Sequence, residues 1–320
     1  VSSKLQGNPS ALKLSVLFGD KQAIGQMEKL VMNPDAGIEV RRQTMEILID
    51  SNSPNLKSIS DKLLKNKEMK IWAVRGLSKF EDNQTGEMLV SNLQNFDGEE
   101  RQEVVEILCG RINWADVLLS GIENGQVSKS LISPYHALQI QSLKDENLAK
   151  RLAQCWGVIR TSPEFLSKRK EELRVELNPS SLSKADLKRG SSVYDQQCSG
   201  CHQLYGRGGN LGPDLTGSGR SNLDYLLENI VDPNSAVSAD YRMNVLSLKD
   251  GRVLSGMIAG QDRNSLTLRM PGTETVVSKA DIKKRETLEN SIMPAGLLDN
   301  LKQEERRDLI AYLMHGQSVN

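Results

Sequence analysis

A regular spacing of apolar segments constrains the first half of this chain more than any other feature. Similar motifs recur at intervals of about 30 residues, namely RRQTMEIL, AVRGLSKF, RQEVVEIL and YHALQIQSL. Each motif carries one leucine of a matching series, Leu48, Leu77, Leu108 and Leu138. Such a period predicts an α-solenoid of paired amphipathic helices, in which each pair covers the apolar face of its neighbour.

We expect this helical domain to span residues 1–161 and to be closest to a solenoid of HEAT repeats. Three isolated side chains, Cys109, His136 and Cys155, fall on its helices among apolar residues. We expect them to be structural, because nothing near them in sequence resembles a set of metal ligands. Residues 162–183 are charged and then rich in Pro and Ser, so they predict a connector.

The second half contains one compact motif, Cys198, Cys201 and His202 in the pattern Cys-x-x-Cys-His. Two thiols three residues apart lie on one face of a helical turn. They can form thioethers to the two vinyl groups of a haem, and the adjacent imidazole then becomes an axial ligand of the iron. The motif predicts one covalently bound haem c with His202 as ligand.

Three other uses of the motif are weaker. A zinc site would need a second pair of ligands, and the remaining cysteines and histidines are isolated. A thioredoxin-like redox pair would follow a βαβ pattern, which is not visible here. A disulfide between Cys198 and Cys201 would leave His202 without a role.

The flanking sequence from about residue 183 to the C-terminus resembles the class I cytochrome c family. Gly190 and Tyr194 stand where the family has a glycine and an aromatic residue at a helix crossing. RRDLIAYL, residues 306–313, resembles the family's C-terminal helix. The resemblance implies that Leu309 and Tyr312 face Gly190 and Tyr194.

The segments LGPDLTG and Gly219-Arg220 also match that family. The resemblance implies that the carbonyl of Pro213 accepts a hydrogen bond from Nδ1 of His202, and so orients the imidazole. It also implies that the guanidinium of Arg220 approaches a haem propionate. The alternative for Arg220 is a solvated charge at the start of a helix.

A methionine is the expected sixth ligand, because a His/Met pair suits electron transfer. We favour Met293, since it precedes Pro294 on a loop directly before the C-terminal helix. Met270 precedes Pro271-Gly272 between two strand-like runs and is expected in a hairpin turn. The other candidates are Met243 and Met257 in strand-like runs and Met314 in the last helix.

Residues 241–286 differ from their surroundings and read as an insertion of five short strands. Leu266, Leu268 and Met270 alternate with polar residues, and Asp250-Gly251 predicts a tight turn between the first two strands. We expect a small module like an SH3 or Sm barrel. The predicted fold is therefore mainly α, with a HEAT-like solenoid followed by a class I cytochrome c fold, residues 184–320, carrying this insertion.

The order of these parts resembles the planctomycete–verrucomicrobial type of haem-binding proteins. The segments that carry this resemblance include CWGVIR, the CxxCH motif, GPDLTG and SIMPAGLL. It implies electron transfer in the periplasm or at the cell surface but does not identify the donor. The expected partner is a redox partner protein or a dehydrogenase domain. Attachment of haem c also requires reduced thiols outside the cytoplasm.

Composition narrows the range of partners. The chain has 41 basic and 41 acidic residues, so it offers no excess positive charge for nucleic acid. No apolar run approaches the roughly 20 residues that span a membrane.

The leading expectation is therefore an electron-transfer protein rather than an enzyme. Two alternatives stay open. A haem-based gas sensor or peroxidase would need an open sixth position on the iron. A repeat scaffold with a structural haem would place the main function in the helices.

Overall fold

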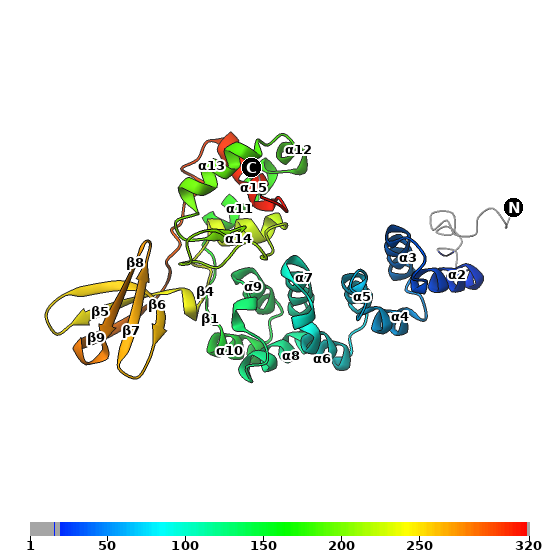
Figure 1. Cartoon of the computed structure of the whole chain (residues 1–320), viewed down its shortest axis with the longest axis horizontal. Helices are drawn as coiled ribbons and strands as arrows, with labels where there is room; N and C mark the ends of the chain where they lie inside the picture. Colours follow the sequence, from blue (N-terminus) through cyan, green and yellow to red (C-terminus); the bar gives the residue numbers. More distant parts are fainter. Residues whose placement is uncertain (1–15, 17–19, 319–320) are drawn as a thin grey trace. The chain divides into compact units, whose positions relative to one another are not determined.

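A computed structural model describes Val16 and residues 20–318 of the chain (Figure 1). The first residues of the predicted helical domain therefore lie outside the described part. The chain divides into two compact units, Val1–Asn95 and Phe96–Asn320. Because the division falls inside the predicted domain 1–161, the later helices of that domain group with the C-terminal half.

The described part of the first unit is helical. Its helices are α2 (Lys21–Met32), α3 (Ile38–Asp50), α4 (Leu56–Leu63), α5 (Lys70–Leu77), α6 (Asn83–Asn92) and the short η2 (Leu93–Asn95). Leu48 and Leu77, two leucines of the repeated series, are fully buried. The sequence period thus marks the core face of these helices correctly.

The second unit begins with four further α-helices and a short 3₁₀ turn. They are α7 (Gly98–Cys109), α8 (Ile112–Glu123), η3 (Lys129–Leu131), α9 (Pro134–Ser142) and α10 (Glu146–Cys155). Leu108 is fully buried and Leu138 is half-buried. The side chain of Cys109 is buried and that of Cys155 half-buried, and both thiols are free, as expected for structural residues.

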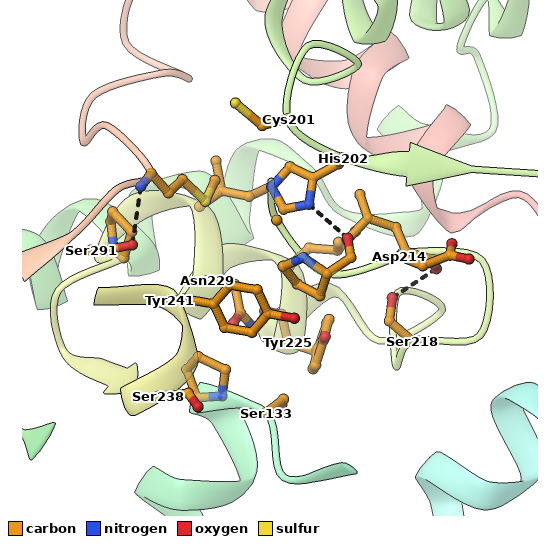
Figure 2. Close-up of a pocket in the computed structure, with 18 of the residues that line it drawn as sticks. Ser133, Cys201, His202, Asp214, Ser218, Tyr225, Asn229, Ser238, Tyr241 and Ser291 are labelled. Carbon is orange, nitrogen blue, oxygen red and sulfur yellow. Dashed lines mark hydrogen bonds between the residues drawn. The ribbon is translucent and has the colours of Figure 1, made fainter. Parts of the chain in front are cut away.

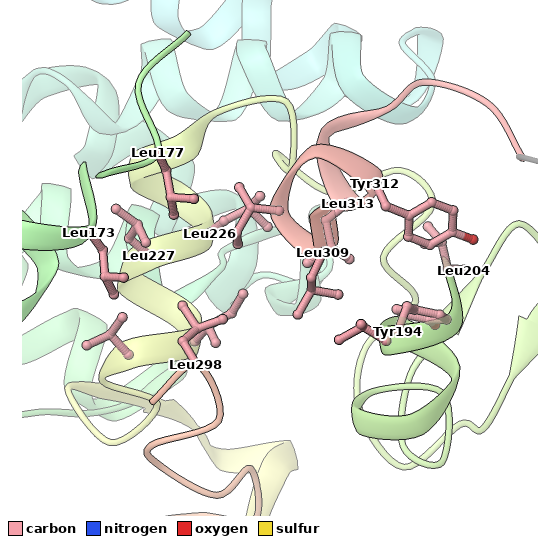
Figure 3. Packing of buried hydrophobic residues seen from close by; sticks show 14 residues of the cluster. Leu173, Leu177, Tyr194, Leu204, Leu226, Leu227, Leu298, Leu309, Tyr312 and Leu313 are labelled. Carbon is pink, nitrogen blue, oxygen red and sulfur yellow. The ribbon is translucent and has the colours of Figure 1, made fainter. Parts of the chain in front are cut away.

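The segment expected as a connector is instead part of the core. It forms α11 (Glu164–Glu176) and α12 (Pro179–Leu182). Leu173 and Leu177 are fully buried in a cluster with residues of α14 (Leu223–Val231) and of the C-terminal helix (Figure 3). Two of the charged residues that suggested a connector pair with α14 instead, Lys170 with Glu228 and Arg174 with Asp224.

Two helices cross closely in the last third of the chain. They are α13 (Leu187–Gln197) and α15 (Gln303–Met314). A Cβ atom added to Gly190 would lie 2.1 Å from the carbonyl oxygen of Asp308, so only glycine fits at the crossing. The rings of Tyr194 and Tyr312 pack with their centroids 5.8 Å apart (Figure 3). The contacts expected between these two segments are confirmed.

A buried carboxylate reinforces the same crossing. The side chain of Asp308 has no exposed surface and accepts hydrogen bonds from Nε of Arg189, Nε of Arg307 and the backbone N–H of Asp186. Burial alone would raise the pKa of Asp308, but these bonds from Arg189, Asp186 and Arg307 outweigh it and the pKa lies below its ordinary value.

The five strands predicted within residues 241–286 are present. They are β5 (Arg242–Leu248), β6 (Val253–Gln261), β7 (Ser265–Met270), β8 (Thr273–Ser278) and β9 (Ile282–Ser291). Gly251 and Gly272 have φ values of 90° and 71°, so both expected hairpin turns are confirmed.

The expected barrel is wrong, because the sheet is open. Its strands follow the order β8-β7-β6-β5-β9, all antiparallel, and β8 does not pair with β9 (Figure 1). Four leucines and one valine form its small core, Leu246, Leu248, Leu266, Leu268 and Val277. The two outer strands are exposed along most of their length, so closing the sheet would bury little further apolar surface.

The predicted fold class is corrected accordingly. The chain is 52 % helical and also carries this antiparallel sheet, so it is not mainly α with a barrel insertion. The structure does not establish a class I cytochrome c fold. No helix in the described residues is long and apolar enough to cross a membrane.

A short two-stranded ribbon joins the early helices of the second unit to its later part. Strand β1 (Gly157–Ile159) pairs antiparallel with β4 (Ala236–Ser238). A Cβ atom on Gly157 would lie 2.2 Å from the carbonyl oxygen of Val237, so the close pairing requires glycine. The indole N–H of Trp156, directly before the ribbon, donates to the carbonyl of Ile132 at 2.7 Å.

Replacing Gly190 by alanine should separate α13 from α15. The added methyl group overlaps backbone atoms of Asp308, which cannot rotate away as a side chain can. We expect the free energy of unfolding to fall by about 3 kcal/mol, measured by urea denaturation. Gly25→Ala on α2, where nothing lies within 4 Å of the new Cβ, is the control. Equal stability of the two variants would refute the close crossing.

The buried His136 should make stability depend on pH. Burial lowers its pKa to about 4, although a hydrogen bond to the Leu131 carbonyl opposes the shift. Between pH 6.5 and 4 the unfolded chain therefore binds a proton that the folded chain does not. Stability should fall by about 1.4 kcal/mol per pH unit over this range, and be unaffected by this group above pH 6.5.

Urea denaturation of the protein and of His136→Gln from pH 7.5 to 4.5 tests this expectation. Glutamine does not titrate, so the variant should lose less stability than the parent as the pH falls below 6.5. Parallel stability curves for the two proteins would contradict it.

Candidate functional site

The Cys-x-x-Cys-His motif lies in a turn at the end of α13. Cys198 is the C-cap of the helix, and its carbonyl accepts hydrogen bonds from the backbone N–H of Cys201 at 3.0 Å and of His202 at 2.9 Å. These bonds continue the helical path for one more turn. The sequence expectation of a single turn carrying both thiols is thus matched by the backbone.

A glycine-rich hairpin closes around this turn. Strands β2 (Gln203–Leu204) and β3 (Arg207–Gly208) pair directly after the motif. Gly208 has a φ of 112°, and a Cβ atom there would lie 2.1 Å from the carbonyl oxygen of His202. The hydroxyl of Tyr194 donates to that same carbonyl at 2.8 Å, so helix α13 and the hairpin hold the backbone of His202 from two sides.

One nitrogen of the His202 imidazole is hydrogen-bonded, and the other is free. Its Nδ1 lies 2.9 Å from the carbonyl oxygen of Pro213. A carbonyl only accepts, so Nδ1 carries the proton and Nε2 presents a lone pair. Burial lowers the pKa of His202, although the hydrogen bond that Nδ1–H donates to the Pro213 carbonyl opposes this shift. The lowered pKa favours the neutral ring that a metal ligand requires.

A Cβ atom on Gly212 would lie 2.4 Å from Cε1 of His202. The ring is therefore confined by the backbone of the segment that also presents Pro213. The hydrogen bond that the sequence implied between His202 and Pro213 is present in the structure, whereas its role in binding a cofactor stays a prediction.

A cavity of about 410 Å³ lies beside the imidazole, within the size range of cofactor pockets. Figure 2 shows Cys201 and His202 on one side of it and Ser133 and Ser238 on the other. Most of its wall is apolar. The apolar lining includes Leu131, Ile132, Leu215, Leu226, Ile230, Val237, Ile292, Leu297 and Leu313.

Both cysteines of the motif line this cavity and are free thiols. Burial and, to a lesser extent, the nearby Cys201 raise the pKa of Cys198 to about 12. Burial also raises the pKa of Cys201. Both thiols are therefore protonated at neutral pH. No group of three or more His, Cys, Asp or Glu side chains in the described chain could hold a metal ion, so the motif does not converge as zinc ligands would.

Met293 lines the same cavity and packs against the core cluster of α14 and α15. Its backbone N–H donates to the hydroxyl of Ser291 at 3.1 Å, which fixes the loop where it passes the cavity (Figure 2). Met270 does not line the cavity; it ends β7 opposite Thr273. The structure thus brings Met293, and not Met270, to the site.

Arg220 lies away from the cavity wall. Its side chain is 2 % exposed and donates to the backbone carbonyls of Leu215, Leu313 and His315. Its guanidinium also packs over the ring of Tyr205. These bonds satisfy carbonyls at the end of α15, where a positive charge also complements the helix dipole. Arg220 is not among the residues that line the cavity, and its expected contact with a propionate stays a prediction.

Two further observations indicate that the residues of the cavity suit a haem. Ser238 is 7 % exposed, lines the cavity, and has no hydrogen-bond partner for its hydroxyl. A buried polar atom of this kind costs free energy unless a bound group satisfies it. The free Nε2 of His202 and the two thiols provide the bonds that a haem c requires.

Sequence reasoning did not find one wall of the cavity. Gly98, Arg101 and Gln102 of α7 and residues 130–134 before α9 all line it. These residues precede the motif by about 65 to 100 positions. Their only local signal is the pair Asp97-Gly98, a combination that is typical of turns.

Comparison with known protein families supports this interpretation of the site. Residues 185–246 match the family described as cytochrome C oxidase, cbb3-type, subunit III. The matched segment contains the Cys-x-x-Cys-His motif, Pro213 and α14, and ends before Met293. No curated protein matches the chain significantly. The family match supports a cytochrome c domain in this segment, and such a domain implies binding of haem c and suggests electron transfer.

Proposed function

We propose that the chain binds one haem c covalently and serves as an electron-transfer protein. The observation that carries this proposal is the hydrogen bond between Nδ1 of His202 and the Pro213 carbonyl. It directs the free nitrogen of a neutral imidazole toward a cavity that two free thiols also line. Haem supplies reversible one-electron exchange between its ferric and ferrous states when bound.

The thiols of Cys198 and Cys201 would each add across one vinyl group. The sulfur forms the new bond to carbon, and the thiol hydrogen passes to the neighbouring carbon, so the step needs no oxidant. His202 would bind the iron through Nε2. The Pro213 carbonyl strengthens this ligand, because a hydrogen bond at Nδ1 makes the other nitrogen a better donor.

Met293 would supply the sixth ligand from the opposite loop. Its thioether is a soft, neutral donor, and a His/Met pair raises the reduction potential. The apolar wall acts in the same direction, since it disfavours the additional positive charge of the ferric state. With six ligands in place, no position on the iron is open to a substrate, which separates an electron carrier from a sensor or a peroxidase.

We place the protein in the periplasm or at the cell surface, with a redox partner protein or a dehydrogenase domain as electron donor. Attachment through two thioethers supports this location, because the reaction needs thiols delivered reduced outside the cytoplasm. The chain has 41 basic and 41 acidic residues, so its net charge does not favour a strongly charged partner.

Intact mass should exceed the polypeptide mass by one haem, and acidic organic solvent should not extract the chromophore. Cys198→Ala and Cys201→Ala should each keep one thioether, whereas the double variant should release its haem in that solvent. Cys155→Ala, which changes a half-buried thiol on α10, is the matched control and should match the parent. A colourless protein, or one equivalent of zinc, would overturn the proposal.

Met293→Ala should remove the weak near-infrared band of a thioether bound to ferric haem. It should also lower the midpoint potential and let the ferrous form bind carbon monoxide. Met270→Ala, at the end of β7, should leave all three properties unchanged.

Carbon monoxide binding by the unmodified protein at neutral pH would favour a gas sensor or peroxidase over an electron carrier. The reverse pattern between the two methionine variants would assign the ligand to Met270.

A further inference from the structure

The first turn of helix α7 reaches the cavity through a close backbone contact between Gly98 and Gly217. A Cβ atom on Gly217 would lie 3.1 Å from Cα of Gly98, and one on Gly98 would lie 3.9 Å from Cα of Gly217. Gly98 is the first residue of α7 and has a φ of 36°, a value that residues other than glycine rarely adopt. Two glycines in contact thus let the first turn of α7 reach the cavity next to the segment that carries Pro213.

Arg101, one turn into α7, is the only lysine or arginine among the described residues that line the cavity. Its Nε and Nη2 both donate to the carbonyl of Phe96, with the Nε bond at 2.8 Å. This pair of bonds fixes the plane of the guanidinium. Its Nη1 has no hydrogen-bond partner among the described residues, so the two N–H groups of Nη1 are free to bind a ligand.

The cavity wall holds one carboxylate, that of Asp214. It accepts a hydrogen bond from the backbone N–H of Thr216 at 2.8 Å, and no ion pair joins it to Arg101 in the described structure. An arginine that lines a mostly apolar cavity without a counter-ion favours an anionic ligand, because guanidinium groups bind carboxylates in two-point geometry.

We propose that Arg101 binds a propionate carboxylate of the haem, the role that the sequence had suggested for Arg220. This inference rests on the proposed haem binding. Arg220 donates to the carbonyl of Leu215 and to two carbonyls at the end of α15, and it does not line the cavity. Arg101 comes from outside the segment of family resemblance, residues 185–246, so helix α7 contributes directly to the cofactor site.

A cation at this position stabilises the ferrous state relative to the ferric state, because it offsets the negative charge of the propionate. It also keeps that carboxyl ionised to lower pH. Arg101→Gln should therefore lower the midpoint potential at pH 8. We expect a roughly tenfold change in the ferric-to-ferrous ratio at fixed potential, or 59 mV for one electron.

The difference between variant and parent should narrow as the pH falls toward 5. Without the guanidinium the propionate takes up a proton at higher pH, and its negative charge is lost. The midpoint of Arg101→Gln should thus depend more steeply on pH than that of the parent. Arg101→Lys, which keeps the charge but not the planar fork, should restore most of the potential.

The experiment measures midpoint potentials from pH 5 to 8 by spectroelectrochemical titration of the full-length haem protein. Arg263→Gln is the control, since it removes the same charge from an exposed turn between β6 and β7. Covalent haem and an unchanged circular dichroism spectrum establish that each variant is folded. Arg263→Gln should match the parent at every pH.

Two failures are distinguishable. If none of the proteins holds covalent haem, the proposed function is wrong. If haem is bound but Arg101→Gln titrates like Arg263→Gln, the assignment of Arg101 is wrong; a shift in Arg220→Gln alone would return the propionate contact to Arg220.

Discussion

The close crossing of α13 and α15 at Gly190 is the contact on which the functional half of the chain depends. Helix α13 ends at Cys198, so the position of the crossing sets where the Cys-x-x-Cys-His turn begins. The buried carboxylate of Asp308 joins the two helices at the same point, and Arg220 holds the far end of α15. A shift of either helix would move the thiols relative to the segment that orients His202.

Features that rest on short-range rules could be predicted from the sequence. The turns at Gly251 and Gly272 need a positive φ, and glycine in a Asp-Gly or Pro-Gly pair supplies it. The helix crossing at Gly190 was implied by the resemblance to class I cytochromes c, and the short distance to the Asp308 backbone explains why glycine is needed there. The five strands of the sheet followed from their alternating pattern.

Features that depend on distant contacts could not be predicted in the same way. Whether five strands close into a barrel depends on what the outer strands would bury, and β8 and β9 are mostly exposed. Residues 162–183 looked like a connector because charges dominate their composition, yet two leucines among them, Leu173 and Leu177, are sufficient to fix α11 in the core. For the site, the residues themselves indicated the Cys-x-x-Cys-His motif and favoured Met293, whereas the roles of Pro213 and Arg220 both came from the family resemblance. The wall that α7 provides carries no local signature.

The ribbon of β1 and β4 has a consequence for the order in which the molecule folds. Contacts close in sequence form before distant ones, because closing a long loop costs more conformational entropy. The turn at residues 198–202 and its hydrogen bond to Pro213 span few residues, whereas pairing Gly157 with Ser238 closes a loop that contains α11 to α14. The thiols should therefore be presented on a formed turn while the α7 side of the cavity is still open. Pairing of the ribbon then completes the part of the cavity wall that Val237 and Ser238 line.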